Sequence, residues 1–369
     1  MRVLYFVERF WPFIGGVEIM SARILPELAD RGIEFAIVTS READELPERD
    51  RYRGIDVHRL PFERALRTKD VDTIASCRQR FAAIKEEFAP DLQHMLFTGA
   101  GIYFALMAAA VRPCPVLLSF HGSWPLAVFR RQGLVRQVMA ASDWFTGCSD
   151  STLAELVSVD GTIVDRATTI YNGLDFAAEP GPLDFEHPLI LCSARIEPEK
   201  GMDLAVEAVR QLRDEFPALR LRIVGDGSVR RELELSALRA GLDGAVEFMG
   251  WRAPDEMPRL VEQATIVLVP SRLEGFGLVA LEGMAAGRPV IATRVGGLQE
   301  VVGEDGGILV EPSAGAIADA VRELLRDPAR AKAVARAGRL RAQAVFPLHR
   351  CVDAYESLYR ELTTNTHAS

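Results

Sequence analysis

Strand-like and helix-like segments alternate along the whole chain of 369 residues. This alternation is typical of parallel sheets whose strands are joined by crossover helices. The strand-like runs form two sets, separated by residues 176–188, which are rich in Pro, Gly and acidic residues and have no period. The first set contains 2–7, 34–39, 56–60, 92–97, 116–121, 144–148 and 168–171, and the second contains 189–194, 221–224, 246–249, 265–269, 289–293 and 308–310. The pattern predicts two α/β domains joined by a linker.

The length and composition also favour two cores over one. A hydrophobic content of 49% over 369 residues exceeds what one ordinary core would hold. We expect an N-terminal domain over residues 1–180, a second domain over 181–345 and a C-terminal helix over 346–369. Pro26 lies inside a helical pattern and should kink or break that helix.

Charge and hydropathy exclude several classes of protein. The net charge of −9 and the pI near 5.4 argue against a nucleic-acid partner, whose phosphates need a basic face. Apolar runs such as 103–111 are far shorter than the ~20 residues that cross a bilayer, and we expect neither a membrane span nor a signal peptide. The five cysteines are scattered and lack metal-ligand spacing, which favours free thiols in a reducing, cytoplasmic compartment.

The most specific pattern begins at the apolar run 265–269. A loop with Gly275 and Gly277 follows this run, and a helical pattern follows the loop. Such a unit places the free N–H groups of a helix N-terminus at the carboxyl end of a parallel sheet, where phosphates bind. Glu274 in the loop and Glu282 in the helix could reach different parts of one ligand. Alternatively, Glu282 only complements the helix dipole and Glu274 is a solvated acid.

Two other loops of the second domain follow predicted strands. Arg195 and Lys200 lie five positions apart just before a helix. Two cations at a helix N-terminus oppose the dipole unless an anion binds between them. Gly225 and Asp226 form half of a dinucleotide fingerprint, but Arg230 occupies the position of its third glycine, which argues against a nicotinamide cofactor.

The first domain carries weaker signals. Gly15 and Gly16 lie between the first strand and its helix, where they could expose N–H groups to an anion or simply form a tight turn. His121 follows an apolar strand at the end where α/β active sites gather, although a packed or solvated histidine is the alternative. Trp124 on the same loop could be an apolar platform for a substrate or could pack against the next helix.

A basic and apolar face is predicted after this loop. Arg130, Arg131 and Arg136 lie among the apolar residues of 126–135. The face could lie against an anionic membrane that carries a lipid substrate, or it could belong to an ordinary solvated helix.

The residues from Pro270 to Thr293 read Pro-Ser-x-x-Glu-Gly-Phe-Gly-Leu-Val-x-Leu-Glu-x-Met-Ala-x-Gly-x-Pro-Val-Ile-Ala-Thr. This stretch resembles the donor site of retaining glycosyltransferases of family 4. The Gly15-Gly16 loop and the Arg195 to Lys200 loop resemble that family's Gly-Gly-x-Glu and Gly-Arg-x-x-x-x-Lys-Gly motifs, with Ala194 in place of a glycine. The specific motifs are concentrated between residues 190 and 301.

The resemblance implies an α/β protein with the GT-B fold, in which two Rossmann-like parallel-sheet domains face each other across a cleft. It also implies that the C-terminal helix crosses back to the N-terminal domain. Four residues would be catalytic: His121, Glu274, Arg195 and Lys200. The donor-binding residues would be Gly15, Gly16, Gly225, Asp226, Trp251, Arg252, Gly275, Phe276, Gly277, Leu278 and Glu282.

Within that set, the resemblance assigns individual roles. Arg195 and Lys200 would hold the donor diphosphate, Glu282 would accept the ribose hydroxyls, and Glu274 would accept hydroxyls of the transferred sugar. His121 would lie near the donor sugar. No metal and no other cofactor is expected, because these cations and a helix N-terminus would neutralise the diphosphate and no Asp-x-Asp pair lies in a motif loop.

The implied function is the transfer of a hexosyl group from a UDP- or GDP-linked sugar to an acceptor hydroxyl, with retention, in glycan, glycolipid or glycoconjugate biosynthesis. The acceptor would be a sugar, a lipid-linked molecule or another small molecule, bound by the first domain. The enzyme would be cytoplasmic, with peripheral contact to the inner face of the membrane if the basic and apolar face binds lipid. Two alternatives stay open. One is a nucleotide-sugar epimerase, against which the Arg/Lys and Glu pairs argue, and the other is a non-catalytic nucleotide-sugar-binding partner in a glycan assembly.

Overall fold

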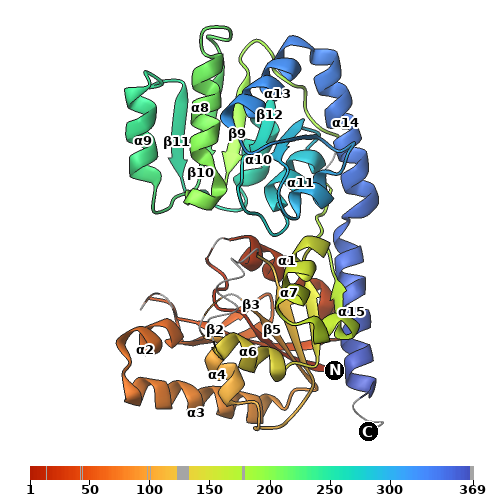
Figure 1. Ribbon diagram of the computed structural model, residues 1–369. Helices are drawn as coiled ribbons and strands as arrows, with labels where there is room; N and C mark the ends of the chain where they lie inside the picture. Colours follow the sequence, from red (N-terminus) through yellow and green to blue (C-terminus); the bar gives the residue numbers. More distant parts are fainter. Residues whose placement is uncertain are drawn as a thin grey trace. The chain divides into compact units, whose positions relative to one another are not determined.

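The computed structural model describes residues 1–13, 15–41, 43, 45–97, 99, 101–122, 133–176 and 179–365. The chain divides into two compact units (Figure 1). Unit 1 is Met1–Tyr171 together with the C-terminal helix from His349 onward, and unit 2 is Asn172–Leu348. Both are α/β units built on parallel sheets, which confirms the predicted fold class.

Unit 1 contains a sheet with the strand order β3-β4-β2-β1-β5-β6-β7-β8. All neighbouring pairs are parallel except β3 and β4. The strands are β1 (Arg2–Phe6), β2 (Glu34–Ser40), β3 (Arg49–Tyr52), β4 (Ile55–Leu60), β5 (Leu92–Leu96), β6 (Val116–Phe120), β7 (Trp144–Gly147) and β8 (Ala167–Thr169). The helices are α1 (Gly16–Asp30), α2 (Phe62–Thr68), α3 (Val71–Phe88), α4 (Ile102–Met107), α6 (Gly133–Ala140), α7 (Asp150–Val159), η1 (Gly161–Arg166) and α15 (Leu348–Asn365).

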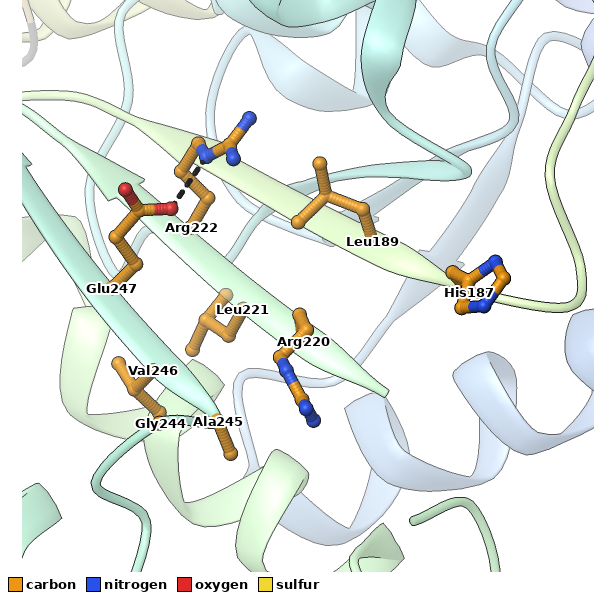
Figure 2. A pocket seen from close by; sticks show the side chains of 9 residues that line it. All are labelled: His187, Leu189, Arg220, Leu221, Arg222, Gly244, Ala245, Val246 and Glu247. Carbon is orange, nitrogen blue, oxygen red and sulfur yellow. Dashed lines mark hydrogen bonds and ion pairs between the residues drawn. The ribbon is translucent and has the colours of Figure 1, made fainter. Parts of the chain in front are cut away.

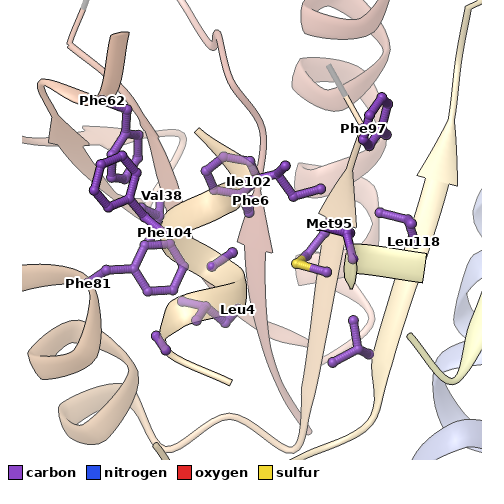
Figure 3. Packing of buried hydrophobic residues seen from close by; sticks show 14 of the residues in the cluster. Leu4, Phe6, Val38, Phe62, Phe81, Met95, Phe97, Ile102, Phe104 and Leu118 are labelled. Carbon is purple, nitrogen blue, oxygen red and sulfur yellow. The ribbon is translucent and has the colours of Figure 1, made fainter. Parts of the chain in front are cut away.

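The core of unit 1 is rich in aromatic side chains (Figure 3). Phe6 on β1 packs near Phe62 and Phe81, and Phe62 stacks on Phe104 with 4.7 Å between ring centroids. The central strands are buried along their whole length because helices cover both faces of the sheet.

Unit 2 contains a parallel sheet with the order β11-β10-β9-β12-β13-β14. The strands are β9 (Leu189–Ser193), β10 (Arg220–Val224), β11 (Val246–Gly250), β12 (Ile266–Val269), β13 (Val290–Thr293) and β14 (Ile308–Val310). The helices are η2 (Pro198–Lys200), α8 (Met202–Leu212), α9 (Arg230–Arg239), α10 (Met257–Gln263), α11 (Leu278–Ala285), α12 (Leu298–Val302), α13 (Ala314–Arg326) and α14 (Pro328–Val345). The first three strands follow each other to one side and the last three to the other, as in a doubly wound Rossmann sheet.

The predicted interruption of α1 at Pro26 is wrong. The helix continues from Gly16 to Asp30 with Pro26 buried inside it. A proline cannot donate to the carbonyl four residues earlier, which leaves that acceptor unpaired within the helix. Here the Tyr52 hydroxyl of β3 donates to this carbonyl, on Ala22, at 3.3 Å. A neighbouring strand thus supplies the donor that the proline removes.

The segment before β9 belongs to unit 2. Leu174 exchanges backbone hydrogen bonds with Phe346 and Leu348, and the buried guanidinium of Arg288 donates to the carbonyls of Gly181 and Pro182. The units therefore divide at residue 171, before the predicted boundary at 180. None of the described helices is both long and apolar enough to cross a membrane.

Candidate functional site

The site of unit 2 lies where the sheet changes direction. β9 and β12 are neighbours, but the chain leaves β9 toward β10 and leaves β12 toward β13. Ligands of doubly wound sheets bind at such a point, outside the carboxyl ends of the strands. Residues 194–201 follow β9 and residues 270–277 follow β12. These two loops carry Arg195, Lys200 and Glu274.

The structure brings Lys200 and Glu274 together. The Lys200 Nζ atom lies 2.8 Å from Oε2 of Glu274, and the two side chains are only 16% and 18% exposed. The hydroxyl of Ser271, which is buried, donates to the same oxygen at 3.0 Å. Arg195 is exposed, and its Nη2 atom lies 3.4 Å from Glu199 Oε1. A cation and a carboxylate from two separate loops are therefore in direct contact.

A second contact fixes the two loops against each other. The guanidinium of Arg272 donates to both carboxylate oxygens of Asp203 at 2.7 and 2.6 Å, and to the Pro198 carbonyl at 2.9 Å. The hydrogen bond from Arg272 lowers the pKa of the Asp203 carboxyl. The backbone N–H groups of Arg272 and Leu273 both donate to the Glu199 carbonyl. Sequence reasoning missed Arg272 because it occupies an unspecified position of the motif.

Two glycines allow the close approach of the loops. Gly201 has φ +65°, and a Cβ atom there would lie 2.0 Å from the Pro270 carbonyl oxygen. Gly225, after β10, has φ +129°, and a Cβ atom there would lie 1.9 Å from the Ala194 carbonyl oxygen. Only glycine fits at these positions.

The loop after β12 leads into α11 as predicted. Gly277 precedes the helix, Leu278 is its first residue, and the Gly297 N–H donates to the Glu274 carbonyl at 3.1 Å. The predicted donor residue Phe276 is buried, and its ring packs edge-on against Phe346 at 5.7 Å. The Phe276 side chain is therefore part of the core and anchors the loop. Gly275 precedes it in the same loop, and Glu282 is half-buried one turn into α11.

Other predicted donor residues lie at the ends of β10 and β11. Asp226 accepts hydrogen bonds from the Gly227 N–H and from Arg230 Nη1, both at 2.8 Å, which lower the pKa of its carboxyl. Arg230, in the place of a fingerprint glycine, thus anchors this loop. Trp251 is exposed, and the Nε atom of Arg252 is buried with no hydrogen-bond partner among the described residues.

The remaining predicted site residues belong to unit 1. Gly15 caps α1 and Gly16 begins it. His121 follows β6, is half-buried, and has a buried Nδ1 atom without a hydrogen-bond partner in the described part of the chain. Burial lowers the pKa of His121 to about 4, so the imidazole is neutral at pH 7. Trp124, Arg130 and Arg131 lie outside the described residues, and Arg136 is exposed on α6.

A groove of about 550 Å³ lies at the amino ends of the strands of the unit 2 sheet (Figure 2). It is lined by the first residues of β9, β10 and β11, including Leu189, Arg220 and Val246, and by His187. In Figure 2 the Arg222 side chain turns to Glu247, with which it forms an ion pair at 2.8 Å. Because this edge holds the amino ends of the strands, the groove is separate from the site after β9 and β12.

Comparisons with known proteins identify the family of the chain. Residues 14–178 match the family model for Glycosyltransferase Family 4, and residues 176–341 match the model for Glycosyl transferases group 1. The chain is 27% identical to an uncharacterised glycosyltransferase of Methanocaldococcus jannaschii, over 96% of this chain and 97% of the relative. It is 30% identical to D-inositol 3-phosphate glycosyltransferase 1 of Catenulispora acidiphila, over 94% of this chain and 90% of the relative.

Two solved structures share the fold. Sucrose-phosphate synthase from Thermosynechococcus elongatus is 24% identical, with a TM-score of 0.83 and coverage of 99% of both chains. The Anabaena protein HepE in complex with UDP-glucose is 20% identical, with a TM-score of 0.82 and coverage of 98% of this chain and 100% of that one. With its two parallel-sheet units and these matches, the chain belongs to the group 1 and family 4 glycosyltransferases and has the GT-B fold.

Proposed function

We propose that the protein transfers a hexosyl group from a UDP- or GDP-linked sugar to an acceptor hydroxyl, with retention and without a metal. The observation that carries the proposal is the pairing of Lys200 with Glu274 at the carboxyl ends of β9 and β12, beside the N-terminus of α11. A phosphorylated sugar needs both groups, a cation for its phosphates and a carboxylate for its hydroxyls.

Lys200 and Glu274 neutralise each other before the donor binds. When the diphosphate arrives, its oxygens attract the Lys200 ammonium, and the Glu274 carboxylate accepts a hydroxyl of the sugar in exchange. Arg195, which is exposed and weakly held, turns to the same diphosphate. Each charge-assisted hydrogen bond contributes about 1.5–3 kcal/mol, so the cations and the helix N-terminus stabilise the leaving diphosphate without a divalent ion.

We infer a transfer with retention in the following steps. The bond between the anomeric carbon and the diphosphate oxygen breaks, and the acceptor oxygen bonds to the same face of that carbon. The departing phosphate oxygen takes the acceptor proton. Glu282, one turn into α11, accepts the ribose hydroxyls.

The test is a panel of UDP- and GDP-sugars, incubated in excess EDTA with and without acceptor sugars. We expect one donor to raise the melting temperature, to be hydrolysed slowly without acceptor, and to be used faster with one. Turnover that EDTA abolishes and Mg²⁺ or Mn²⁺ restores would contradict metal independence. An epimerised sugar nucleotide as the product would identify an epimerase, and binding without turnover would identify a non-catalytic partner.

Lys200→Ala tests the role of the cation in this site. It removes the cation and leaves Glu274 without that partner, while the Arg272 contacts still join the two loops. We expect donor hydrolysis to fall about 10- to 100-fold and the melting temperature to fall moderately. A loss of melting temperature in proportion to the loss of activity would make Lys200 structural.

A further inference from the structure

We propose that α9 is a dimerisation helix, which packs in antiparallel orientation against α9 of a second copy of this chain. In this pairing, exposed leucines meet at the centre, and Glu232 of each copy forms an ion pair with Arg239 of the other. The inference is independent of the proposed glycosyl transfer, because α9 holds none of the residues assigned to that reaction.

α9 leaves an apolar stripe uncovered on its outer side. The helix leads from β10 to the edge strand β11 and lies at one end of unit 2 (Figure 1). Its inner side packs into the core of that unit through Leu233 and Ala237. On the outer side, Leu235 and Leu238 are 43% and 58% exposed. Because residues three positions apart are neighbours on a helix surface, these two leucines form one continuous stripe.

Contacts within the chain fix the start of α9 without using this stripe. Arg230, the first residue of the helix, donates to Glu234 at 2.7 Å and to Asp226 at 2.8 Å. The charges of Arg230 and Glu234 are therefore paired within the chain. A helix that is already held in place loses little conformational freedom when another surface packs against it.

The charges that flank the stripe are unpaired. Glu232 and Arg239 are exposed, and within the described part of the chain neither side chain has an ion pair or a hydrogen bond. Their separation of seven residues is two helical turns, or about 10 Å, so they lie on the same side of the helix and cannot reach each other. Each of the two charges thus lacks an opposite charge that a neighbouring molecule could supply.

A second copy of α9 supplies both missing partners. A two-fold axis in the plane of the contact reverses the direction of the helix and keeps its left and right sides. It therefore brings Glu232 of each copy to the level of Arg239 of the other, so that the ion pair forms twice. Leu235 meets its own counterpart, and Leu238 meets the aliphatic stem of Arg231. A parallel pairing would instead bring like charges together, which excludes that orientation.

The length of α9 sets the strength of the contact. The helix has 10 residues and is therefore about 15 Å long. Specific interfaces bury about 1,200–2,000 Å² in total, and a contact made by one short helix from each copy lies at or below the lower end of this range. We expect a dimer with a dissociation constant in the micromolar range, which forms at high protein concentration.

The experiment is sedimentation of the full chain at concentrations from about 1 µM to about 1 mM. Glu232→Arg and Arg239→Glu are measured alone and as an equimolar mixture. Leu238→Ser tests the apolar stripe, and its control is Leu340→Ser on α14, because the two leucines are 58% and 57% exposed. Thermal unfolding of every variant checks that unit 2 is still folded.

We expect Glu232→Arg and Arg239→Glu each to raise the dissociation constant of the dimer about tenfold or more, because each change creates two like-charge pairs. The mixture should regain the wild-type affinity, since opposite charges again meet at both places in the mixed dimer.

Leu238→Ser should weaken the dimer, whereas Leu340→Ser should not. A chain that stays monomeric at the highest concentration, or a dimer that Glu232→Arg leaves unchanged, would overturn the proposal. A mixture that stays as weak as the single variants would rule out the antiparallel pairing.

Discussion

Before a donor binds, the Lys200 ammonium and the Glu274 carboxylate lie 2.8 Å apart in a half-buried position. This pair lets the site hold two opposite charges without leaving either unpaired, which would destabilise the loops. It also means that a substitution of one partner changes the charge seen by the other. The roles of Glu274 and Glu282 can be separated by isosteric variants, which remove the charge of each side chain and keep its shape.

We expect Glu274→Gln to leave the affinity for free UDP or GDP equal or higher, because Lys200 loses its competing carboxylate. The same variant should lower the rate of transfer, because the sugar ring loses a charged acceptor that positions it. Glu282→Gln should weaken nucleoside diphosphate and donor alike, since its proposed contact is the ribose. Calorimetry with both diphosphates and initial rates decide the matter. Lost diphosphate binding in Glu274→Gln, with unchanged binding in Glu282→Gln, would reverse the two roles.

Two histidines of unit 1 whose pKa values are lowered make the stability of that unit depend on pH. Burial lowers the pKa of His121 to about 4 and the pKa of His94 well below its usual value. In the unfolded chain both titrate near pH 6.5. Below about pH 6.5 the unfolded state binds protons that the folded state does not. The stability is therefore full above pH 6.5 and falls as the pH falls toward the folded values.

The slope should rise toward about 1.4 kcal/mol per pH unit for each histidine as the pH falls from 6.5 to 5. Urea unfolding of unit 1 at several pH values measures it. His94→Gln should lower the slope by the contribution of one proton. Equal slopes in the wild type and His94→Gln would refute the assignment.

At the scale of elements, the proposed donor site depends on the contact between the loops after β9 and β12. Arg272 makes a bidentate ion pair with Asp203 at the start of α8 and also binds the Pro198 carbonyl. Arg210 on α8 makes a bidentate ion pair with Glu207 at 2.7 Å, but both residues of this pair lie on the same helix. Arg272 and Arg210 can therefore be compared in one experiment, because only Arg272 links the two loops.

Arg272→Ala should weaken nucleoside diphosphate binding about tenfold, because the loop that carries Lys200 loses its anchor to the loop that carries Glu274. Arg210→Ala should leave binding unchanged. Exposed ion pairs contribute only about 0.2–1 kcal/mol, so both variants should melt close to the wild type. Calorimetry and thermal unfolding measure the two quantities, and equal affinities in the two variants would show that the loops hold their positions without Arg272.

The elements that could be predicted from the sequence are those with buried apolar runs. The strands of unit 2 lie within a residue or so of their predicted places, since each is a short apolar run and the inner strands β12 and β13 are buried throughout. β3 was missed, because its residues Arg49–Tyr52 are charged and exposed at the sheet edge and carry no hydrophobic period. The error at Pro26 has the same origin, because the hydroxyl that replaces the missing donor comes from β3.

The candidate site was predictable as a set of loops but not as a set of contacts. Arg195, Lys200 and Glu274 all follow strands, so their common edge could be inferred from the sequence. The pairing of Lys200 with Glu274 depends on β9 lying beside β12, and strand order is not encoded in the alternation of elements. The link from Arg272 to Asp203 depends on the same order.

At the scale of the whole molecule, the last helix completes a unit that begins at the first residue. α15 buries Cys351, Val352, Tyr355, Leu358, Tyr359 and Leu362. The Tyr359 hydroxyl lies 2.6 Å from His94 Nδ1 on β5, and Arg31 at the end of α1 pairs with Asp353 and Glu356. Unit 1 is therefore built from the two ends of the chain, whereas unit 2 is continuous in sequence.

We expect a chain that ends at Leu348 to lose the fold of unit 1 and to keep that of unit 2. The buried side chains of α15 contribute roughly 10 kcal/mol, at about 1.5–3 kcal/mol each, which matches the whole stability of an ordinary domain. Unit 2 retains its own core and the residues that pair Leu174 with Phe346 and Leu348. Amide hydrogen exchange should show lost protection in β1 and β5 with protection kept in β9 and β12.

The truncated chain should still bind the nucleoside diphosphate that the full chain binds, with an affinity within a fewfold, because Lys200, Arg195 and the N-terminus of α11 lie in unit 2 and unit 1 would add only the Gly15-Gly16 loop. Tyr359→Phe provides the milder variant. It removes one hydroxyl, leaves His94 Nδ1 without that partner and should cost about 1–3 kcal/mol in unit 1 alone. Protection that persists in β1 after truncation would show that unit 1 is stable without α15. Protection lost equally from β9 would show that the two units unfold together, and that the stability of the donor site depends on the helix at the end of the chain.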